Sequence, residues 1–441
     1  MARLRLPAAL QRLLRVRVTT RGGALVGAGA ALAAVGVVLD LPDVVGLGAA
    51  ALLAVAAAWV LLGVQRLDSG RGALDVVRRI DPNPVVAGRA ATTRLEVRAR
   101  ARTGAAYERL GRLRLSEQAA HELAGSTGIR ARVRAHPDHI AVRYSITPVR
   151  RGRWPLGPVL TTRTDVFGLV RTTQPLGEAT RVAVWPRTTA VDARAAVLGD
   201  VDRAATGARL SSPDDSVLRE YVPGDDPRRV HWPRSARQDR IMVRADESAG
   251  LRPVTVLLDR SLLAPRPEDR LGARQPTARE IDDGEWAVEL AASVATSFLD
   301  AGHPTRLVAT DADPGRTYQV VGSRTRREAV LDATVDLTGV RGAEADAALS
   351  TTVRTLRAVR YRSEITIAVL GPLGPTSRET VAALGTEGHC SALLVIPRQE
   401  SRRPGLNSTA DDLRAAGWRV ASCFPGTSPD RAWSAATERA A

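Results

Sequence analysis

The sequence contains no lysine, so all 63 of its basic residues are arginine. A phosphate-binding loop of the Gly-x-x-x-x-Gly-Lys type is therefore excluded, and no Gly-x-Gly-x-x-Gly follows an expected strand. Nucleotide binding is accordingly unsupported. Aromatic residues make up only 3% of the chain, and no stretch interleaves them with arginine. We therefore expect no nucleic-acid partner, because single strands bind on rows of stacked aromatic and basic side chains.

Cysteine is nearly absent, with Cys390 and Cys423 as its only occurrences. Two thiols provide neither a disulfide framework nor, by themselves, a tetrahedral zinc site. Each cysteine lies beside an apolar run, which is typical of small buried side chains in a reducing compartment.

Positive charge is in excess, with a formal net charge of +16 over 441 residues. A solvated arginine surface combined with codon bias would produce this surplus without any partner. Attraction to an anionic lipid surface is the alternative, because the surplus begins beside the apolar segments. The length leaves room for two or three domains, each with its own core.

The longest apolar runs lie near the start of the chain. Residues 1–21 carry arginine and no acid, and their apolar side chains recur at helical spacing, which predicts a basic amphipathic segment on a membrane surface. Gly22–Leu39 and Val44–Val64 are uncharged and close to the ~20 residues that cross a bilayer as a helix. A signal peptide is the alternative for the first run. The second run, after a four-residue turn, favours a two-helix transmembrane hairpin over residues 22–64.

The arginine distribution predicts the orientation of this hairpin. Six arginines precede the first run, none lies in the turn, and Arg66, Arg71, Arg78 and Arg79 follow the second run. The positive-inside bias then places both ends in the cytoplasm. We expect a multi-pass protein of the inner (plasma) membrane whose soluble domains face the cytoplasm.

Residues 80–186 change to a period of two. Apolar side chains alternate with polar ones around Leu95–Ala99, Ile140–Ile146 and Val182–Val184, with turn residues between them. This pattern predicts an antiparallel, immunoglobulin-like β-sandwich of about seven strands. Its outward arginines form either a solvated face or a basic surface for lipid or a partner: Arg94, Arg98, Arg100, Arg102, Arg130, Arg132 and Arg134. Residues 187–216 are polar and irregular, which indicates a mobile linker.

Residues 248–430 alternate short apolar runs with amphipathic ones. The runs predict strands at 254–258, 305–309, 318–321, 365–370, 393–396 and 418–424, and helices at 281–299, 326–335, 343–359, 377–384 and 409–416. Fully apolar strands between amphipathic helices predict an α/β domain with a parallel sheet covered on both faces. A final helix or frayed tail is expected from Trp433.

Polar and charged residues are densest in Val217 to Glu247, where Ile241–Val243 reads as a short strand. The pattern consists of Arg219, Tyr221, Gly224, Asp225, Asp226, Arg229, Val230, His231, Trp232, Ser235, Ala236 and Arg237. It resembles the signature of the bacterial domain of unknown function 58 family, in which many members carry aspartate at the position of His231. The resemblance extends upstream through Arg150-Arg151-Gly152 and Asp165-Val166-Phe167-Gly168-Leu169.

The resemblance implies more about architecture than about chemistry. It implies an α/β half of the von Willebrand factor type A kind and a MoxR-type AAA+ ATPase as partner, in envelope or complex assembly. We therefore expect a membrane-anchored adaptor that binds protein partners and is not an enzyme.

The signature allows two interpretations. Arginine–aspartate pairs would form a buried, charge-compensated joint between the two soluble domains, with Trp232 packed as its apolar floor. The alternative is a metal-assisted hydrolase in which His231 acts as general base beside Asp225 and Asp226, with the metal ion at Asp259. Ser235 lacks the Gly-x-Ser-x-Gly turn of a nucleophile.

A metal site is the remaining candidate. Asp259 and Ser261 follow the first apolar strand of the α/β half, where the carboxyl edge of a parallel sheet meets ligands. They resemble the Asp-x-Ser-x-Ser metal-ion site of von Willebrand factor type A domains, although Leu263 occupies the third position. Mg²⁺ is the ion that such oxygens favour. A helix cap or a turn would explain the same aspartate without any ion.

Overall fold

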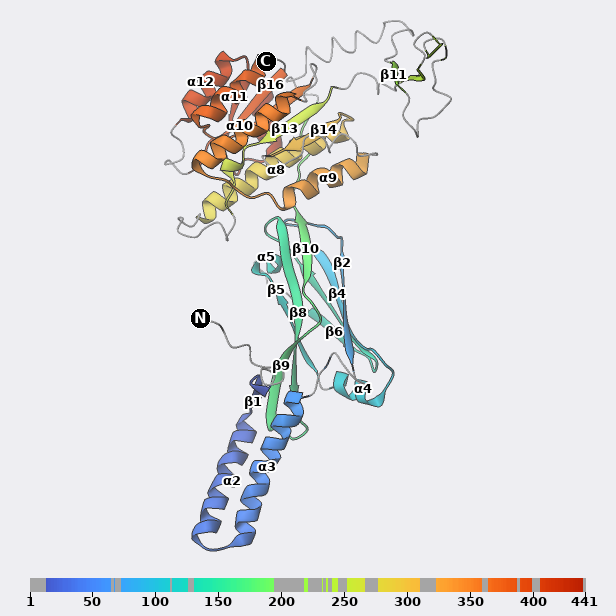
Figure 1. Ribbon diagram of the computed structural model, residues 1–441, viewed down its shortest axis with the longest axis vertical. Helices are drawn as coiled ribbons and strands as arrows, with labels where there is room; N and C mark the ends of the chain where they lie inside the picture. The colour runs from blue at the N-terminus through green and yellow to red at the C-terminus, as the bar shows by residue number, and fades with distance from the viewer. Residues whose placement is uncertain are drawn as a thin grey trace. The chain divides into compact units, whose positions relative to one another are not determined.

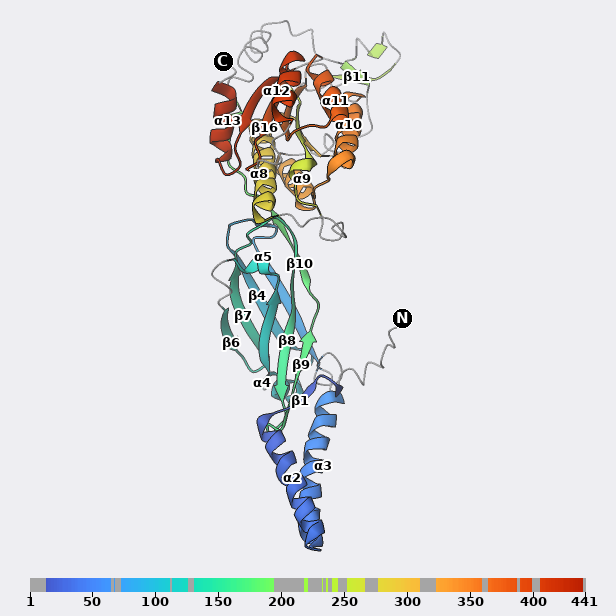
Figure 2. The ribbon, with the colours of Figure 1, turned by 90° about the vertical axis from the view of Figure 1, so that its left-hand side faces the viewer.

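The computed structural model describes residues 13–64, 67, 73–111, 113–125, 131–193, 218–220, 232, 235–236, 240–244, 252–265, 277–309, 323–358, 364–386, 389–398 and 405–438. The chain divides into two compact units, Met1–Val184 and Trp185–Ala441 (Figures 1 and 2). Each unit has its own hydrophobic core.

Two apolar helices form an antiparallel pair near the N-terminus (Figure 1). They are α2 (Thr20–Val38) and α3 (Pro42–Val64), and both are long and apolar enough to cross a membrane. The two expected spans are thus confirmed as helices within a few residues. Small residues bring the helices together, because a Cβ added to Gly48 would lie 2.6 Å from the carbonyl oxygen of Gly29. Such contacts replace the hydrophobic effect where helices pack in lipid.

The segment before α2 is a strand. β1 (Val16–Val18) pairs antiparallel with β9 (Val170–Leu176), so the helical course expected for the basic segment is wrong at these residues. Two β-branched valines flank Arg17, and the free edge of β9 supplies the hydrogen-bonding partners. Residues 1–12 lie outside the described residues.

Antiparallel strands form the rest of the first unit. One sheet has the order β1-β9-β8-β10-β3, with β5 also paired to β8, and the other has the order β2-β4-β7-β6. The new members are β2 (Leu74–Asp81), β3 (Val85–Val86), β4 (Ala91–Ala99), β5 (Arg114–Ala119), β6 (Ala131–Ala135), β7 (His139–Ile146), β8 (Gly152–Thr164) and β10 (Thr180–Trp185), with short helices α4 (Gly104–Gly111) and α5 (His121–Ala124). Residues from both sheets share one core, including Leu95 of β4 and Leu156 of β8.

The period of two located β4, β7 and β10 correctly. The described arginines of the outward set are exposed as expected, namely Arg94, Arg98, Arg100, Arg102, Arg132 and Arg134. β8 and β9 were not predicted. Their buried faces are partly polar, since Thr161 is 1% exposed and its hydroxyl donates to the Gln174 carbonyl oxygen at 2.9 Å. A polar inner face hides the apolar alternation that marks a strand.

A buried ion pair connects the two antiparallel sheets. Arg78 of β2 pairs with Glu117 of β5, and its guanidinium also donates to the Thr180 hydroxyl at 2.8 Å. Burial raises the pKa of Glu117, and Arg78 opposes that rise. Gly157 has φ +93°, and a Cβ there would lie 2.5 Å from the Arg78 guanidinium, so glycine leaves the space that this arginine fills.

The second unit contains a five-stranded parallel sheet of order β14-β13-β15-β16-β17, as expected for the α/β half. Its strands are β13 (Val254–Leu258), β14 (Thr305–Val308), β15 (Ile365–Leu370), β16 (His389–Val395) and β17 (Arg419–Cys423). Helices α8 (Ala278–Asp300), α9 (Ser323–Val335) and α13 (Pro429–Glu438) share one core with the sheet. A second core involves α10 (Gly342–Ala358), α11 (Pro375–Gly385) and α12 (Leu406–Ala415). The expected strand at 318–321 lies outside the described residues.

The described part of the expected linker is docked on the second unit. The backbone N–H groups of Thr189 and Val191 donate to the hydroxyls of Ser293 and Ser297 at 3.0 and 2.9 Å. Val191 is 8% exposed and belongs to the core of that unit. The prediction of a mobile linker is therefore wrong for residues 188–193, because two serines spaced by four on α8 present acceptors along one helix face.

A second buried ion pair joins three neighbouring strands. Arg306 of β14 donates to the Glu364 carboxylate at 2.9 Å and to the Thr255 hydroxyl of β13 at 2.7 Å. Arg306 is 1% exposed and Glu364 is fully buried. Because a buried charge without its partner costs several kcal/mol, this pair favours one register of β14, β13 and β15.

Candidate functional site: a crevice at the carboxyl edge of the parallel sheet

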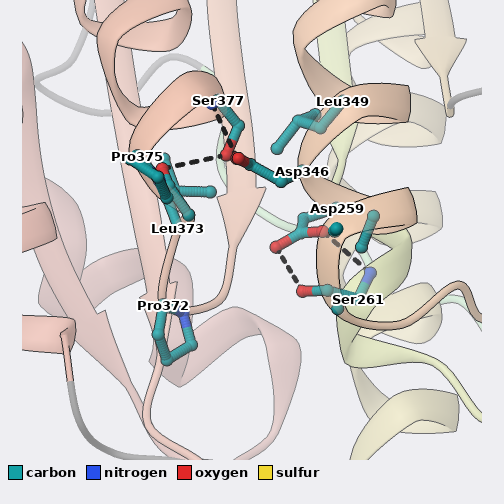
Figure 3. A pocket seen from close by; sticks show the side chains of 12 residues that line it. Asp259, Ser261, Asp346, Leu349, Pro372, Leu373, Pro375 and Ser377 are labelled. Atoms are coloured by element: carbon teal, nitrogen blue, oxygen red, sulfur yellow. Dashed lines mark hydrogen bonds between the residues drawn. The ribbon is translucent and has the colours of Figure 1, made fainter.

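The order in which strands are added to the parallel sheet reverses at β13. From β13 the chain passes to β14 on one side and later to β15 on the other, which makes the gap beyond β13 and β15 a topological switch point. Ligands of open α/β sheets bind at such points. A cavity of about 480 Å³ lies there, lined by Asp259, Ser261, Gly342, Ala343, Ala345, Asp346, Leu349, Pro372, Leu373, Gly374, Pro375 and Ser377 (Figure 3).

Asp259 directly follows β13, and both of its carboxylate oxygens accept hydrogen bonds. Oδ1 accepts from the Ser261 backbone N–H at 2.8 Å, and Oδ2 accepts from the Ser261 hydroxyl at 2.7 Å (Figure 3). Oδ2 also accepts from the Gly371 N–H at 3.0 Å. Asp259 is only 2% exposed, so these donors replace the water that its carboxylate loses. The carboxylate thereby connects the ends of β13 and β15.

The segment before α10 holds the Asp259 loop in place. The Arg260 guanidinium donates to the Thr338 carbonyl oxygen at 2.5 Å, and the Arg341 guanidinium donates to the Ser261 carbonyl oxygen. Gly339 is required at the closest approach, since a Cβ there would lie 2.1 Å from the Leu263 carbonyl oxygen. Two guanidinium groups, one from the loop and one from the segment before α10, therefore connect these two parts of the chain.

Asp346 of α10 supplies the second carboxylate of the crevice. It accepts from the backbone N–H groups of Ser377 and Thr376 at 2.7 and 3.2 Å, and so caps the start of α11 from another helix. Gly374, the N-cap residue of α11, makes no side-chain cap of its own. Partial burial raises the pKa of Asp346, but the hydrogen bonds from Ser377 and Thr376 outweigh it and hold the pKa below its ordinary value. Sequence reasoning missed this residue.

The expected Mg²⁺ site fits these residues poorly. Asp259 and Ser261 are present with their oxygens near each other, but Leu263 is 1% exposed and supplies no ligand. The Ser261 carbonyl oxygen is occupied by Arg341, a cation that repels another cation. Within the described ranges, no group of three or more His, Cys, Asp or Glu side chains is placed to hold a metal ion. The sequence also offers Thr310, Asp311 and Asp313, after the strand expected at 305–309, as further ligands, and these residues lie outside those ranges.

Most of the 217–247 signature lies outside the described residues, including Tyr221, Gly224, Asp225, Asp226, Arg229, His231 and Arg237. Arg219 lies in β11 (Leu218–Glu220), which pairs antiparallel with β12 (Met242–Arg244) and confirms the strand expected near residue 242. Ser235 is 9% exposed, whereas Trp232 is 67% exposed. The residues that would surround Trp232 in the joint lie mostly outside the described residues, so its packing as an apolar floor stays a prediction. The charge-compensated joint and the hydrolase set both stay predictions.

The architecture of the chain can be stated as a class of protein from its fold and its crevice. It combines two apolar helices, antiparallel sheets and a parallel α/β domain with a crevice at its carboxyl edge. Residues 217–412 match the family model described as "Protein of unknown function DUF58", which supports the family that the signature resembles. The match begins at the first residue of the signature and ends within α12. It does not include residues 150–152 or 165–169, to which the resemblance was expected to extend.

Two solved structures share a loose likeness with the chain. One is a point mutant of the PilB minor pilin from Streptococcus sanguinis, with 10% identity, coverage of 86% of this chain and 87% of that chain, and a TM-score of 0.30. The other is the PilB minor pilin of the same organism, with 9% identity, coverage of 74% and 77%, and a TM-score of 0.29. Scores this low carry no argument about fold or function. No curated protein matches the sequence.

Proposed function

We propose that this protein is a membrane-anchored adaptor that binds a protein partner at the crevice of its α/β domain. In this proposal α2 and α3 span the membrane as a multi-pass anchor, and the soluble parts face the cytoplasm. The arginines on both sides of the hairpin and their absence from its turn support that orientation. The antiparallel sheets would be an immunoglobulin-like sandwich, and the α/β domain would be of the von Willebrand factor type A kind.

The observation that carries the proposal is the position and the hydrogen bonding of the two crevice carboxylates. Asp259 and Asp346 both line the cavity, and both are held by backbone N–H groups of neighbouring elements. Asp346, which is only half-buried, presents its carboxylate between small and apolar side chains, and the buried Asp259 adds negative charge behind it. Such a surface suits a basic side chain from a partner loop, because complementary charge gives specificity and a defined register.

The partner of this proposal is a MoxR-type AAA+ ATPase, acting with the protein in envelope or complex assembly. The family match over residues 217–412 supports this choice of partner by association. The crevice then supplies the docking site on this side of the complex.

A pair of substitutions on α10 tests the proposal. Ala343 lines the crevice and is exposed, so Ala343→Arg would fill the cavity with a cation while leaving the hydrogen bonds of Asp259 and Asp346 in place. Ala347 is exposed on the same helix but does not line the crevice, which makes Ala347→Arg the matched control. Binding of the purified MoxR-type ATPase to the full chain in detergent is measured for both variants.

We expect Ala343→Arg to weaken binding at least tenfold, which corresponds to about 1.4 kcal/mol, and Ala347→Arg to leave it unchanged. Equal binding by both variants would remove the crevice as the docking site. Failure of the unsubstituted chain to bind the ATPase would remove the partner.

A further inference from the structure

The turn between β8 and β9 exposes two large apolar side chains at its tip. Val166 is 73% exposed and Phe167 is 75% exposed, and they are consecutive. They belong to the Asp165–Leu169 stretch that the sequence singled out, and nothing in the crevice or the anchor uses them. Adjacent exposed apolar side chains of this size indicate a binding surface.

This turn lies against the base of the apolar hairpin. Thr19, the N-cap residue of α2, donates through its hydroxyl to the carbonyl oxygens of Gly168 and Leu169 at 2.5 and 3.0 Å. Leu169 and Val170 share a small core with Val55 and Leu62 of α3. The turn therefore lies beside the start of α2 and the C-terminal part of α3.

The backbone of the turn is closed on itself. The Asp165 carboxylate accepts from the N–H groups of Phe167 and Val170 at 3.0 and 2.7 Å. The Gly168 N–H donates to the Asp165 carbonyl oxygen at 3.1 Å, and the Asp165 N–H donates to the Val170 carbonyl oxygen at 3.1 Å. Internal satisfaction of backbone donors is what a chain needs where water is scarce, because an unpaired polar group in lipid costs several kcal/mol.

Basic side chains surround the same turn. Arg17 of β1 and Arg171 of β9 are directly opposite each other in the antiparallel ladder, and both are exposed. The Arg21 guanidinium lies near Gly168, 3.7 Å from the position a Cβ would take there. Like charges on opposite strand positions repel each other, and an anionic phosphate between them would remove that penalty.

From these observations we propose that the β8–β9 turn is a third membrane-contacting element beside the two helices. Val166 and Phe167 enter the boundary between headgroups and acyl chains, while Arg17, Arg21 and Arg171 bind the phosphates of anionic phospholipids. The inference rests on the proposed membrane anchor and adds a lipid-binding site to it. Its physical basis is the usual one for interfacial segments, apolar burial combined with attraction to anionic lipid.

The test places a fluorescent label on single cysteines in the full chain reconstituted into phosphatidylcholine vesicles with and without phosphatidylglycerol. The label sites are Phe167→Cys at the turn, Leu53→Cys in α3, and Val149→Cys as the matched control. Val149 is 47% exposed and precedes β8, a strand of 13 residues, so it lies roughly 40 Å from the turn. The unsubstituted chain gives the background, since Cys390 and Cys423 are both buried.

We expect nitroxide-bearing lipids to quench the fluorescence of the label at position 167 several-fold more than that of the label at position 149. Iodide in the aqueous phase should quench the label at position 149 more than the label at position 167. Quenching at 167 should fall without phosphatidylglycerol, whereas quenching at 53 should not. If the label at 53 is quenched by lipid and the one at 167 behaves like the one at 149, the anchor holds and the third contact is overturned. Without lipid quenching at 53, the anchor itself fails. Equal quenching at 167 in both lipid mixtures would overturn the role of the arginines.

Discussion

Asp259 and Asp346 contribute carboxylates to the same cavity, but each accepts hydrogen bonds from a different part of the backbone. Asp259 holds the end of β15 through the Gly371 N–H, and Asp346 holds the start of α11. A Cβ on Gly374 would lie 2.5 Å from the Asp346 carboxylate, so the backbone approaches this group as closely as a glycine allows. At the scale of single residues, the shape of the crevice therefore depends on the hydrogen bonds that these two carboxylates accept.

The Asp346 cap predicts a particular pH dependence of stability. Because its pKa is lowered in the folded protein, the carboxylate stabilises the fold above the pKa it has in the unfolded chain, and this contribution is lost as the pH falls through the folded value. We expect Asp346→Ala to reduce the free energy of unfolding by about 1 kcal/mol at neutral pH, as for other lost helix caps. The difference from the unsubstituted chain should shrink in acid, as measured by denaturant unfolding at a series of pH values.

The control for this experiment lies on the same helix. Glu344 is exposed two residues before Asp346, so Glu344→Ala should change the free energy of unfolding only slightly at any pH. An Asp346→Ala difference that stayed constant into acid would show that the charge of the cap is unimportant.

The α2–α3 hairpin shows how an element without charged contacts can still be specific. Its two helices meet through Gly29, Gly36 and Gly48, and a Cβ on Gly36 would lie 2.7 Å from the Val45 backbone nitrogen. In a membrane, packing between small residues would take the place of the hydrophobic effect, because lipid tails are as apolar as the side chains. The same glycine surface explains why the helices can approach closely without polar side chains.

Substitution of one glycine should separate the helices while a neighbouring glycine tolerates the same change. Gly48→Val places methyl groups against the backbone of α2, whereas nothing lies within 4 Å of a Cβ at Gly46. In detergent, we expect Gly48→Val to abolish an engineered disulfide or cross-link between α2 and α3, and Gly46→Val to leave it intact. Equal cross-linking of both variants would contradict the glycine interface.

At the scale of the whole molecule, each of the two units has hydrophobic cores of its own. Leu95 is 1% exposed in the core of the first unit, and Leu394 is fully buried in a core of the second. Each unit has enough buried apolar surface to unfold as a cooperative body of its own. Residues 188–193 are held on α8 and so belong to the second unit. We therefore expect this segment to unfold together with that unit.

Calorimetry of the full chain in detergent should separate the two units. We expect Leu95→Ala and Leu394→Ala each to cost about 2–5 kcal/mol, but to lower different unfolding transitions. If both substitutions instead lowered one common transition, the charge-compensated joint predicted from Arg219 to Arg237 would gain support.

The sequence predicted most of the fold because its strongest patterns are apolar. The runs at Val254–Leu258 and Ile365–Leu370 became β13 and β15 with the expected bounds, since every residue of both strands is buried and no exposed position obscures their edges. β1 was missed because three residues carry too little pattern, and the docked segment at 188–193 because its apolar residues are sparse.

The crevice was only half predictable. Asp259 was found because it directly follows a buried strand, a position that local sequence can show. Asp346 lies inside an amphipathic helix, where an aspartate usually faces solvent. The only signal for its role is distant in sequence, namely that α11 begins at Gly374-Pro375 without a capping side chain of its own. Which residue would fill that gap depends on tertiary packing.

The pairing of β1 with β9 has a consequence for any soluble form of this protein. β1 is the edge strand of its sheet and lies ahead of both apolar helices in the chain, so removal of the anchor from the N-terminal side also removes this edge. The truncated protein would carry β9 as an open edge next to Phe167, and open edges recruit strands from other molecules. Shortening the chain to make it soluble would thus create a surface that favours self-association.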